Sequence, residues 1–218
     1  MHAFPILAGT EKPAVRRPPA LLRPGAAQAL LQATGSGARG HRDRALVIVL
    51  WRGLLRCAEA CAARIEDLEE LPGGGMALRV MQPKGLASGA VRRTVGIDPQ
   101  SSSYLRAWLE VRPAVTGLPA SSGPLFASST GKALLTAHCR RLVARLGLAA
   151  GLGRVHPHAL RGLGASEMVR ENFSIRHVQL ALGHANLSVT HAYIQSIGCN
   201  ESTELMAGRK WSEPTSRG

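Results

Sequence analysis

The side chains with the greatest capacity for chemistry lie between residues 156 and 195. His158 and Arg161 are three residues apart. His184 follows Arg161 by 23 residues as the end of a Leu-Gly-His triplet, and Tyr193 follows nine residues later. A tyrosine hydroxyl can form a covalent intermediate, a guanidinium can bind two phosphate oxygens at once, and histidine exchanges protons near neutral pH. These groups suit phosphodiester cleavage without a metal ion, provided that enough fixed positive charge faces the phosphate.

The order and spacing of these residues resemble the catalytic end of the tyrosine recombinases, the phage integrase family. Residues 53–70, GLLRCAEACAARIEDLEE, resemble the family's other signature, with Arg56 as the first catalytic arginine and Glu59 as the glutamate three residues later. Three departures stand out. Ala58 replaces the usual serine, an extra leucine precedes Arg56, and Gly162 replaces a second histidine.

A lysine completes the resemblance. Lys84 lies in a Pro-Lys-Gly turn between segments 76–81 and 91–97, whose alternation predicts two strands. The family carries a Lys-Gly pair on such a hairpin. The resemblance implies that Lys84 protonates the leaving 5′ oxygen and that His158 assists proton transfer. It implies that Tyr193 attacks, and that the phosphate is bound by Arg56, Arg161 and His184. Without the resemblance, Arg56 would be an ordinary arginine at a helix start, Lys84 a solvated turn residue and Tyr193 a half-buried helical tyrosine.

The resemblance implies a fold that is mainly α with a small antiparallel β-sheet, the tyrosine-recombinase catalytic domain. We place this domain at residues 16–200, between an N-terminal arm (1–15) and a C-terminal tail (201–218) that could be exchanged between protomers or pack in cis. The implied function is site-specific cleavage and rejoining of DNA through a 3′-phosphotyrosyl intermediate. The alternative is an inactive DNA-binding relative that serves as an accessory module.

Composition favours a polyanionic partner. The 218 residues include 27 basic and 14 acidic side chains, for a net charge of +13. Double-stranded DNA is the expected partner, although a basic RNA-binding scaffold would explain the charge as well. The resemblance implies a tetramer on DNA and no cofactor or metal, and an accessory protein is compatible with it. A membrane role is not expected, because the longest apolar run, residues 45–55, is short and contains Arg52. We therefore expect a bacterial cytoplasmic protein, either nucleoid-associated or encoded on a mobile element.

Most family members carry a helical core-binding domain before the catalytic domain. The residues before Arg17 are too few for one, which favours a short family member or a truncated relative. Cysteines 57, 61, 139 and 199 show neither disulfide-framework nor zinc-site spacing and are expected to be reduced, buried thiols.

Apolar periodicity predicts the elements that must position the candidate residues. Helices are expected over residues 24–33, 41–55, 101–111, 134–146 and 158–172. A further short helix is expected between Ser174 and Gly183. Pro113 and Gly147 are expected to end the third and fourth helices, and Leu135 and Ile175 to face the core. Arg140, Arg141 and Arg145 could face either solvent or DNA.

Overall fold

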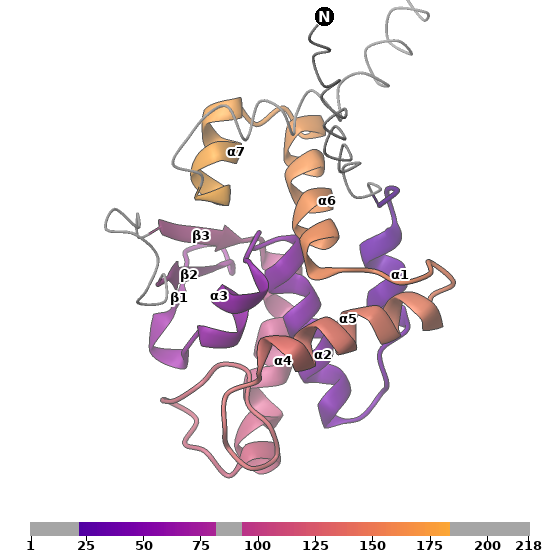
Figure 1. Cartoon of the computed structure of the whole chain (residues 1–218). Helices are drawn as coiled ribbons and strands as arrows, with labels where there is room; N and C mark the ends of the chain where they lie inside the picture. The colour runs from indigo at the N-terminus through magenta and orange to yellow at the C-terminus, as the bar shows by residue number, and fades with distance from the viewer. Residues whose placement is uncertain (1–21, 82–92, 184–218) are drawn as a thin grey trace, which may run out of the picture.

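The computed structural model describes residues 22–81 and 93–183, which form a helical body with a small sheet along one side (Figure 1). Within these ranges none of the helices is both long and apolar enough to cross a membrane. The elements, in chain order, are α1 (Ala26–Gln32), α2 (Ala38–Trp51), α3 (Cys57–Ala62), the 3-10 helix η1 (Ile65–Asp67), β1 (Leu68–Glu70), β2 (Met76–Val80), β3 (Arg93–Ile97), α4 (Pro99–Thr116), α5 (Thr136–Ala149), α6 (Pro157–Arg170) and α7 (Ile175–Leu182).

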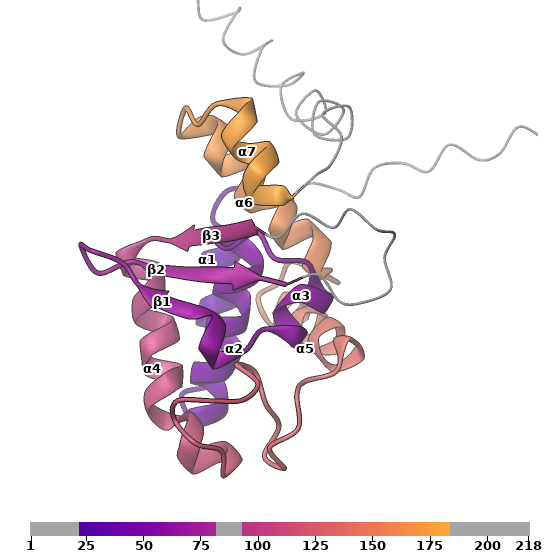
Figure 2. The same cartoon turned by 90° about the vertical axis from the view of Figure 1, so that its left-hand side faces the viewer.

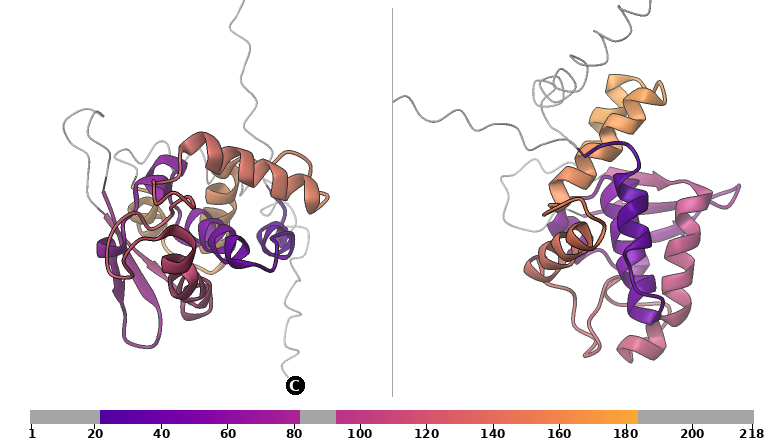
Figure 3. Two further views of the ribbon diagram at one scale, coloured as in Figure 1. Left: turned by 90° about the horizontal axis from the view of Figure 1, so that it is seen from below. Right: turned by 90° about the vertical axis from the view of Figure 1, so that its right-hand side faces the viewer.

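Helix α2 is the centre of the core, as its nearly continuous apolar sequence predicts. It packs against α1, α3, α4 and α6 (Figure 3). Its residues 45–50 are almost completely buried. The helix ends at Trp51 rather than near Leu55. Leu54 adopts a left-handed backbone conformation (φ 52°), so the chain turns sharply before α3 begins. This turn brings Arg56 to the start of α3.

The predicted hairpin strands form, and β1 extends them into an antiparallel sheet in the order β1-β2-β3 (Figure 2). The register pairs Met76 with Ile97 and Val80 with Arg93. Alternate residues of β3 are buried, and Arg93 shares the buried face with Val95 and Ile97. Strand β1 was not predicted, since its sequence, Leu-Glu-Glu, has little apolar alternation.

Helix α4 contradicts the expectation that Pro113 ends the third helix. It runs through Pro113 to Thr116 and stops before Gly117. The buried Arg112 explains why the last turn persists, because its guanidinium donates to the carbonyls of Pro119, Ser122 and Pro124 at 2.7–3.0 Å. The N-terminus also lies earlier than expected, since Asp98 caps the helix by accepting from the backbone N–H of Ser101 at 2.9 Å.

Helices α5 and α7 follow their predicted patterns with three corrections. Leu135 is 74% exposed, because it precedes the first turn of α5 and lies outside its periodicity. Gly147 does not end α5 but is buried within it against Val155. Ile175 is exposed, because the first turn of α7 extends beyond the small cluster of Val178, Leu182 and Leu54. The Ser174 cap and the end at Gly183 are confirmed.

Helix α6, which carries His158 and Arg161, crosses α2 at very short range. A Cβ at Gly164 would lie 1.9 Å from the carbonyl oxygen of Trp51, so only glycine permits this approach. Next to the crossing, the carboxylate of Glu167 accepts from the Trp51 indole at 2.7 Å. These contacts hold α6 close to α2, so that Arg161 on α6 reaches the turn that follows α2.

Replacing Gly164 with Ala should therefore destabilise the protein. The added methyl group must separate α6 from α2, and overpacking of this kind costs about 1–3 kcal/mol. Urea denaturation of the variant measures this loss. Gly96→Ala is the matched control, because no atom lies within 4 Å of the Cβ it would add. Equal denaturation midpoints for Gly164→Ala and the wild type would contradict the close crossing.

Candidate active site

Three of the six predicted catalytic residues line one pocket. Arg56 at the start of α3 meets His158 and Arg161 on α6, and the pocket has a volume of about 1100 Å³. Its other walls come from the residues before α1, from α5 and from the loop before α6. The remaining three predicted residues, Lys84, His184 and Tyr193, lie outside the described residues.

The pocket is strongly basic. Besides the three predicted residues, its lining includes Arg23, Arg140, Arg154 and His156. None of the described residues that line it carries a carboxylate. Fixed positive charge without a competing acid suits a phosphate group of a nucleic acid backbone.

A buried carboxylate behind the pocket binds three arginines. The Glu59 carboxylate accepts two hydrogen bonds from the Arg93 guanidinium, at 2.7 and 2.9 Å. It also accepts from the backbone N–H of Arg56 at 2.7 Å and from the Arg56 side chain at 2.9 Å. Arg161 lies 3.7 Å from the same carboxylate. Glu59 therefore positions the two predicted phosphate-binding arginines relative to one another.

The titration of Glu59 follows from this arrangement. Burial raises the pKa of its carboxyl group, but the hydrogen bonds from Arg93 and from the Arg56 backbone outweigh that effect and lower the pKa to about 2. Glu59 is thus ionised at every physiological pH. Its negative charge offsets part of the repulsion between the three guanidinium groups.

The extra leucine before Arg56 has a structural role. The left-handed conformation of Leu54 turns its carbonyl toward the arginines, where it accepts from Arg161 and, at 3.4 Å, from Arg93. A non-glycine residue in this region is strained by about 1–3 kcal/mol. The strain is offset by the hydrogen bonds to Leu54 and by its buried side chain.

The same two arginines hold the C-terminal end of α7. Arg93 donates to the carbonyl of Ala181 at 2.9 Å, and Arg161 donates to the carbonyl of Leu182. Gly183 ends the helix with φ 58°, and a Cβ there would lie 2.8 Å from the Arg93 guanidinium. Both features favour glycine at this position, and His184 is the next residue in the sequence.

His158 lies in an environment that favours the neutral imidazole. Burial lowers its pKa, and the positive charges of Arg161 and Arg56 lower it further. A neutral imidazole can accept a proton, which is the function of a general base.

Sequence reasoning missed Arg93, which the structure places beside Glu59. The signal was available, because Arg93, Val95 and Ile97 alternate along β3 and two of the three are apolar.

The sequence left open whether the arginines of α5 face solvent or DNA, and the structure answers this in part. Arg140 lines the pocket, whereas Arg145 contacts Asp43 at 3.3 Å.

Glu59→Gln should cost about 3 kcal/mol of unfolding free energy at pH 7, because it leaves buried arginines without their counter-charge. The folded-state pKa of about 2 lies below the ordinary value of 4.5, so the stabilisation is complete above pH 4.5 and is lost as the pH falls through 2. Urea denaturation from pH 7 to pH 2.5 should show a larger loss in the wild type than in the variant, because the pKa of Asp98 is also lowered and its contribution is lost in both proteins. Glu66→Gln, at an exposed ion pair with Arg64, is the control. A Glu59→Gln protein as stable as the wild type at pH 7 would contradict the role assigned to the carboxylate.

Comparison with known proteins identifies the family. The sequence pattern of the phage integrase family matches residues 21–197. The chain belongs to this family, which confirms the resemblance drawn from its motifs. Tyrosine recombinase XerC 1 of Ralstonia nicotianae is 32% identical over 82% of this chain, and a tyrosine recombinase XerC of Mycobacterium sp. (strain KMS) is 34% identical over 84%. The chain spans 56% and 61% of these two relatives.

Solved structures of recombinases share the fold. The XerA recombinase matches with a TM-score of 0.72 and 25% identity, over 90% of this chain and 68% of that one. The XerH site-specific recombinase, in a post-cleavage complex with its palindromic difH substrate, matches with a TM-score of 0.70 and 26% identity, over 87% of this chain and 53% of that one. The predicted fold, mainly helical with a small antiparallel sheet, is confirmed.

Proposed function

We propose that this protein is a site-specific recombinase that cleaves and rejoins double-stranded DNA through a 3′-phosphotyrosyl intermediate. The observation that carries the proposal is the basic pocket, where Arg56, His158 and Arg161 meet without a carboxylate among the described lining residues. The family membership of the chain supports the same chemistry.

In the proposed reaction, the hydroxyl oxygen of Tyr193 attacks the phosphorus and the bond to the 5′ oxygen breaks. His158 accepts the proton of the tyrosine, and Lys84 donates a proton to the departing 5′ oxygen. Arg56, Arg161 and His184 bind the non-bridging oxygens, where negative charge develops. One phosphodiester bond replaces another, so the DNA end can be rejoined by the reverse reaction without a cofactor.

The described contacts support this division of roles. The Arg56 side chain is 42% exposed, so it can reach a phosphate, whereas the buried Arg161 approaches from the pocket wall. The lowered pKa of His158 suits a proton acceptor. His184 follows Gly183, which packs against Arg93, and this short connection supports placing His184 near the same phosphate.

We extend the proposal to organisation and partners. The catalytic domain would comprise residues 16–200, preceded by an arm (1–15) and followed by a tail (201–218) that docks on a neighbouring protomer. Four protomers would assemble on two duplexes in a bacterial cytoplasm, with an accessory protein where a site requires one. The match of the family pattern to residues 21–197 supports the domain boundaries.

A covalent-trapping assay tests the function without knowledge of the target. The full chain is incubated with fragments of its own genome that carry nicks, so that a cleaved strand loses its short 5′-hydroxyl end and rejoining fails. We expect a covalent protein–DNA adduct that persists under denaturing conditions. Proteolytic digestion of the adduct and mapping of the DNA-linked peptide should place the attachment at Tyr193. Binding without adducts at any sequence would contradict the enzyme and favour the inactive DNA-binding relative.

A further inference from the structure

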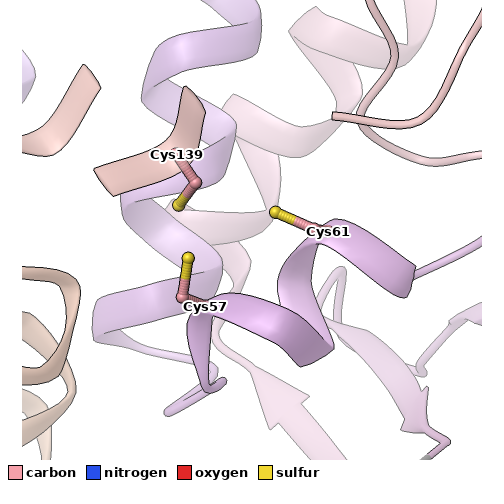
Figure 4. Close-up of side chains that lie close together, drawn as sticks. All are labelled: Cys57, Cys61 and Cys139. Atoms are coloured by element: carbon pink, nitrogen blue, oxygen red, sulfur yellow. The ribbon is translucent and has the colours of Figure 1, made fainter. Parts of the chain in front are cut away.

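Three cysteines that are distant in the sequence meet beside the active site. Cys57 and Cys61 lie one turn apart on α3, and Cys139 faces them from α5, with their sulfur atoms pointing toward one another (Figure 4). All three sulfurs lie within 4.8 Å of one another, and all three thiols are free. The spacing of these residues along the chain did not indicate a site, because the packing of α3 on α5 creates the cluster.

The cluster is accessible from the basic pocket. Cys61 and Cys139 are buried, but Cys57 is only partly buried and lines the pocket next to Arg56. Cys57 is therefore the member of the cluster that lies nearest to solvent. The three thiols converge where α3 and α5 pack against each other at the edge of the pocket.

The cluster also lies beside fixed positive charge. Arg56 and Arg140 line the same pocket as Cys57. The Cys57 thiol donates a hydrogen bond to the carbonyl of Thr136 at 3.5 Å, one turn before Arg140 on α5. The thiolate, rather than the thiol, is the form of cysteine that binds metals.

We propose that Cys57, Cys61 and Cys139 form a three-thiolate binding site for a soft d10 metal ion such as Zn²⁺, Cd²⁺ or Cu(I). Thiolate ligands select this class of ion. With a Zn–S bond of about 2.3 Å, three sulfurs around one ion lie about 4 Å apart, which the cluster reaches by small side-chain rotations. With Zn²⁺ or Cd²⁺ the site would carry one net negative charge, which Arg140 offsets, and water or the Thr136 carbonyl can supply a fourth ligand.

Titration of the reduced full chain with Cd²⁺, without oxygen, tests the site. The near-ultraviolet charge-transfer band of Cd²⁺–thiolate bonds should grow to saturation at one ion per chain, and a chelator in excess, such as EDTA, should remove it. Cys57→Ser should lower the affinity by more than the roughly 10–100-fold that loss of an outer-shell partner costs. Cys199→Ser, which changes the cysteine outside the described residues, should leave both the band and the affinity unchanged.

Thermal unfolding provides a second readout that separates binding from folding. Cd²⁺ should raise the Tm of the wild type and of Cys199→Ser but not that of Cys57→Ser, since only a ligand of the folded state stabilises it. Because Cys57 is partly exposed, Cys57→Ser should have the same Tm as the wild type in the absence of metal. It therefore remains a usable test even if Cys139→Ser, at a buried position, does not fold. Absence of the band in the reduced wild type would overturn the proposal, as would a band that persists in Cys57→Ser or disappears in Cys199→Ser.

Discussion

Replacing Tyr193 with Phe should abolish covalent attachment to DNA while leaving folding and DNA binding nearly unchanged. The substitution removes only the hydroxyl group that we propose as the nucleophile, and phenylalanine cannot form the phosphodiester intermediate. Binding depends instead on the many basic residues, which neutralise backbone phosphates. Denaturing gels of the nicked substrate should show adducts for the wild type and none for the variant, at protein concentrations that saturate binding in a gel-shift assay.

The chain contains one other tyrosine, which provides a matched control. Tyr104 lies on α4, where it is partly buried against the core, and it does not line the basic pocket. Tyr104→Phe should therefore form adducts at the wild-type rate. Adducts that persist in Tyr193→Phe and disappear in Tyr104→Phe would reverse the assignment of the nucleophile.

Arg161→Ala should lower the rate of cleavage per bound complex by about 10²–10³-fold. The arginine is fixed by Glu59 and by the carbonyls of Leu54 and Leu182, so its charge requires little reorganisation when negative charge develops on the phosphate. An interaction that strengthens in the transition state affects the rate more than the binding. Single-turnover cleavage at saturating protein, together with the dissociation constant, separates the two effects.

Arg154→Ala is the control for this prediction. Arg154 lines the same pocket and is exposed, but it has no assigned role in catalysis. If it contacts one phosphate, its removal should weaken binding and reduce the slope of log affinity against log salt by about 0.9, with an unchanged rate per bound complex. The role of Arg161 would be contradicted if its removal abolished binding while the remaining bound complexes reacted at the normal rate.

Much of the helical framework could be predicted because it depends on local patterns. The apolar run of α2, the Ser174 cap and Gly183 end of α7, and the alternation in β2 each reflect contacts between neighbours in the sequence. The errors occurred where a distant contact overrides a local rule. Pro113 remains inside α4 because Arg112 holds the last turn to residues 119–124.

The sequence by itself determined the family and the candidate residues of the site. The order and spacing of Arg56, His158 and Arg161 are linear properties, and the family pattern that matches residues 21–197 is linear as well. The structure places these three residues around one pocket. The catalytic roles of all six candidate residues remain predictions, and Lys84, His184 and Tyr193 lie outside the described residues.

Only the tertiary structure decided how the described site residues are held. Glu59 binds Arg56, Arg93 and Arg161 because α3, β3 and α6 converge there, although the three arginines are up to 105 residues apart in the sequence. The cluster of Cys57, Cys61 and Cys139 forms for the same reason, since α5 packs on α3. Burial changes charges and pKa values through neighbours in space, and linear spacing does not specify which neighbours those are.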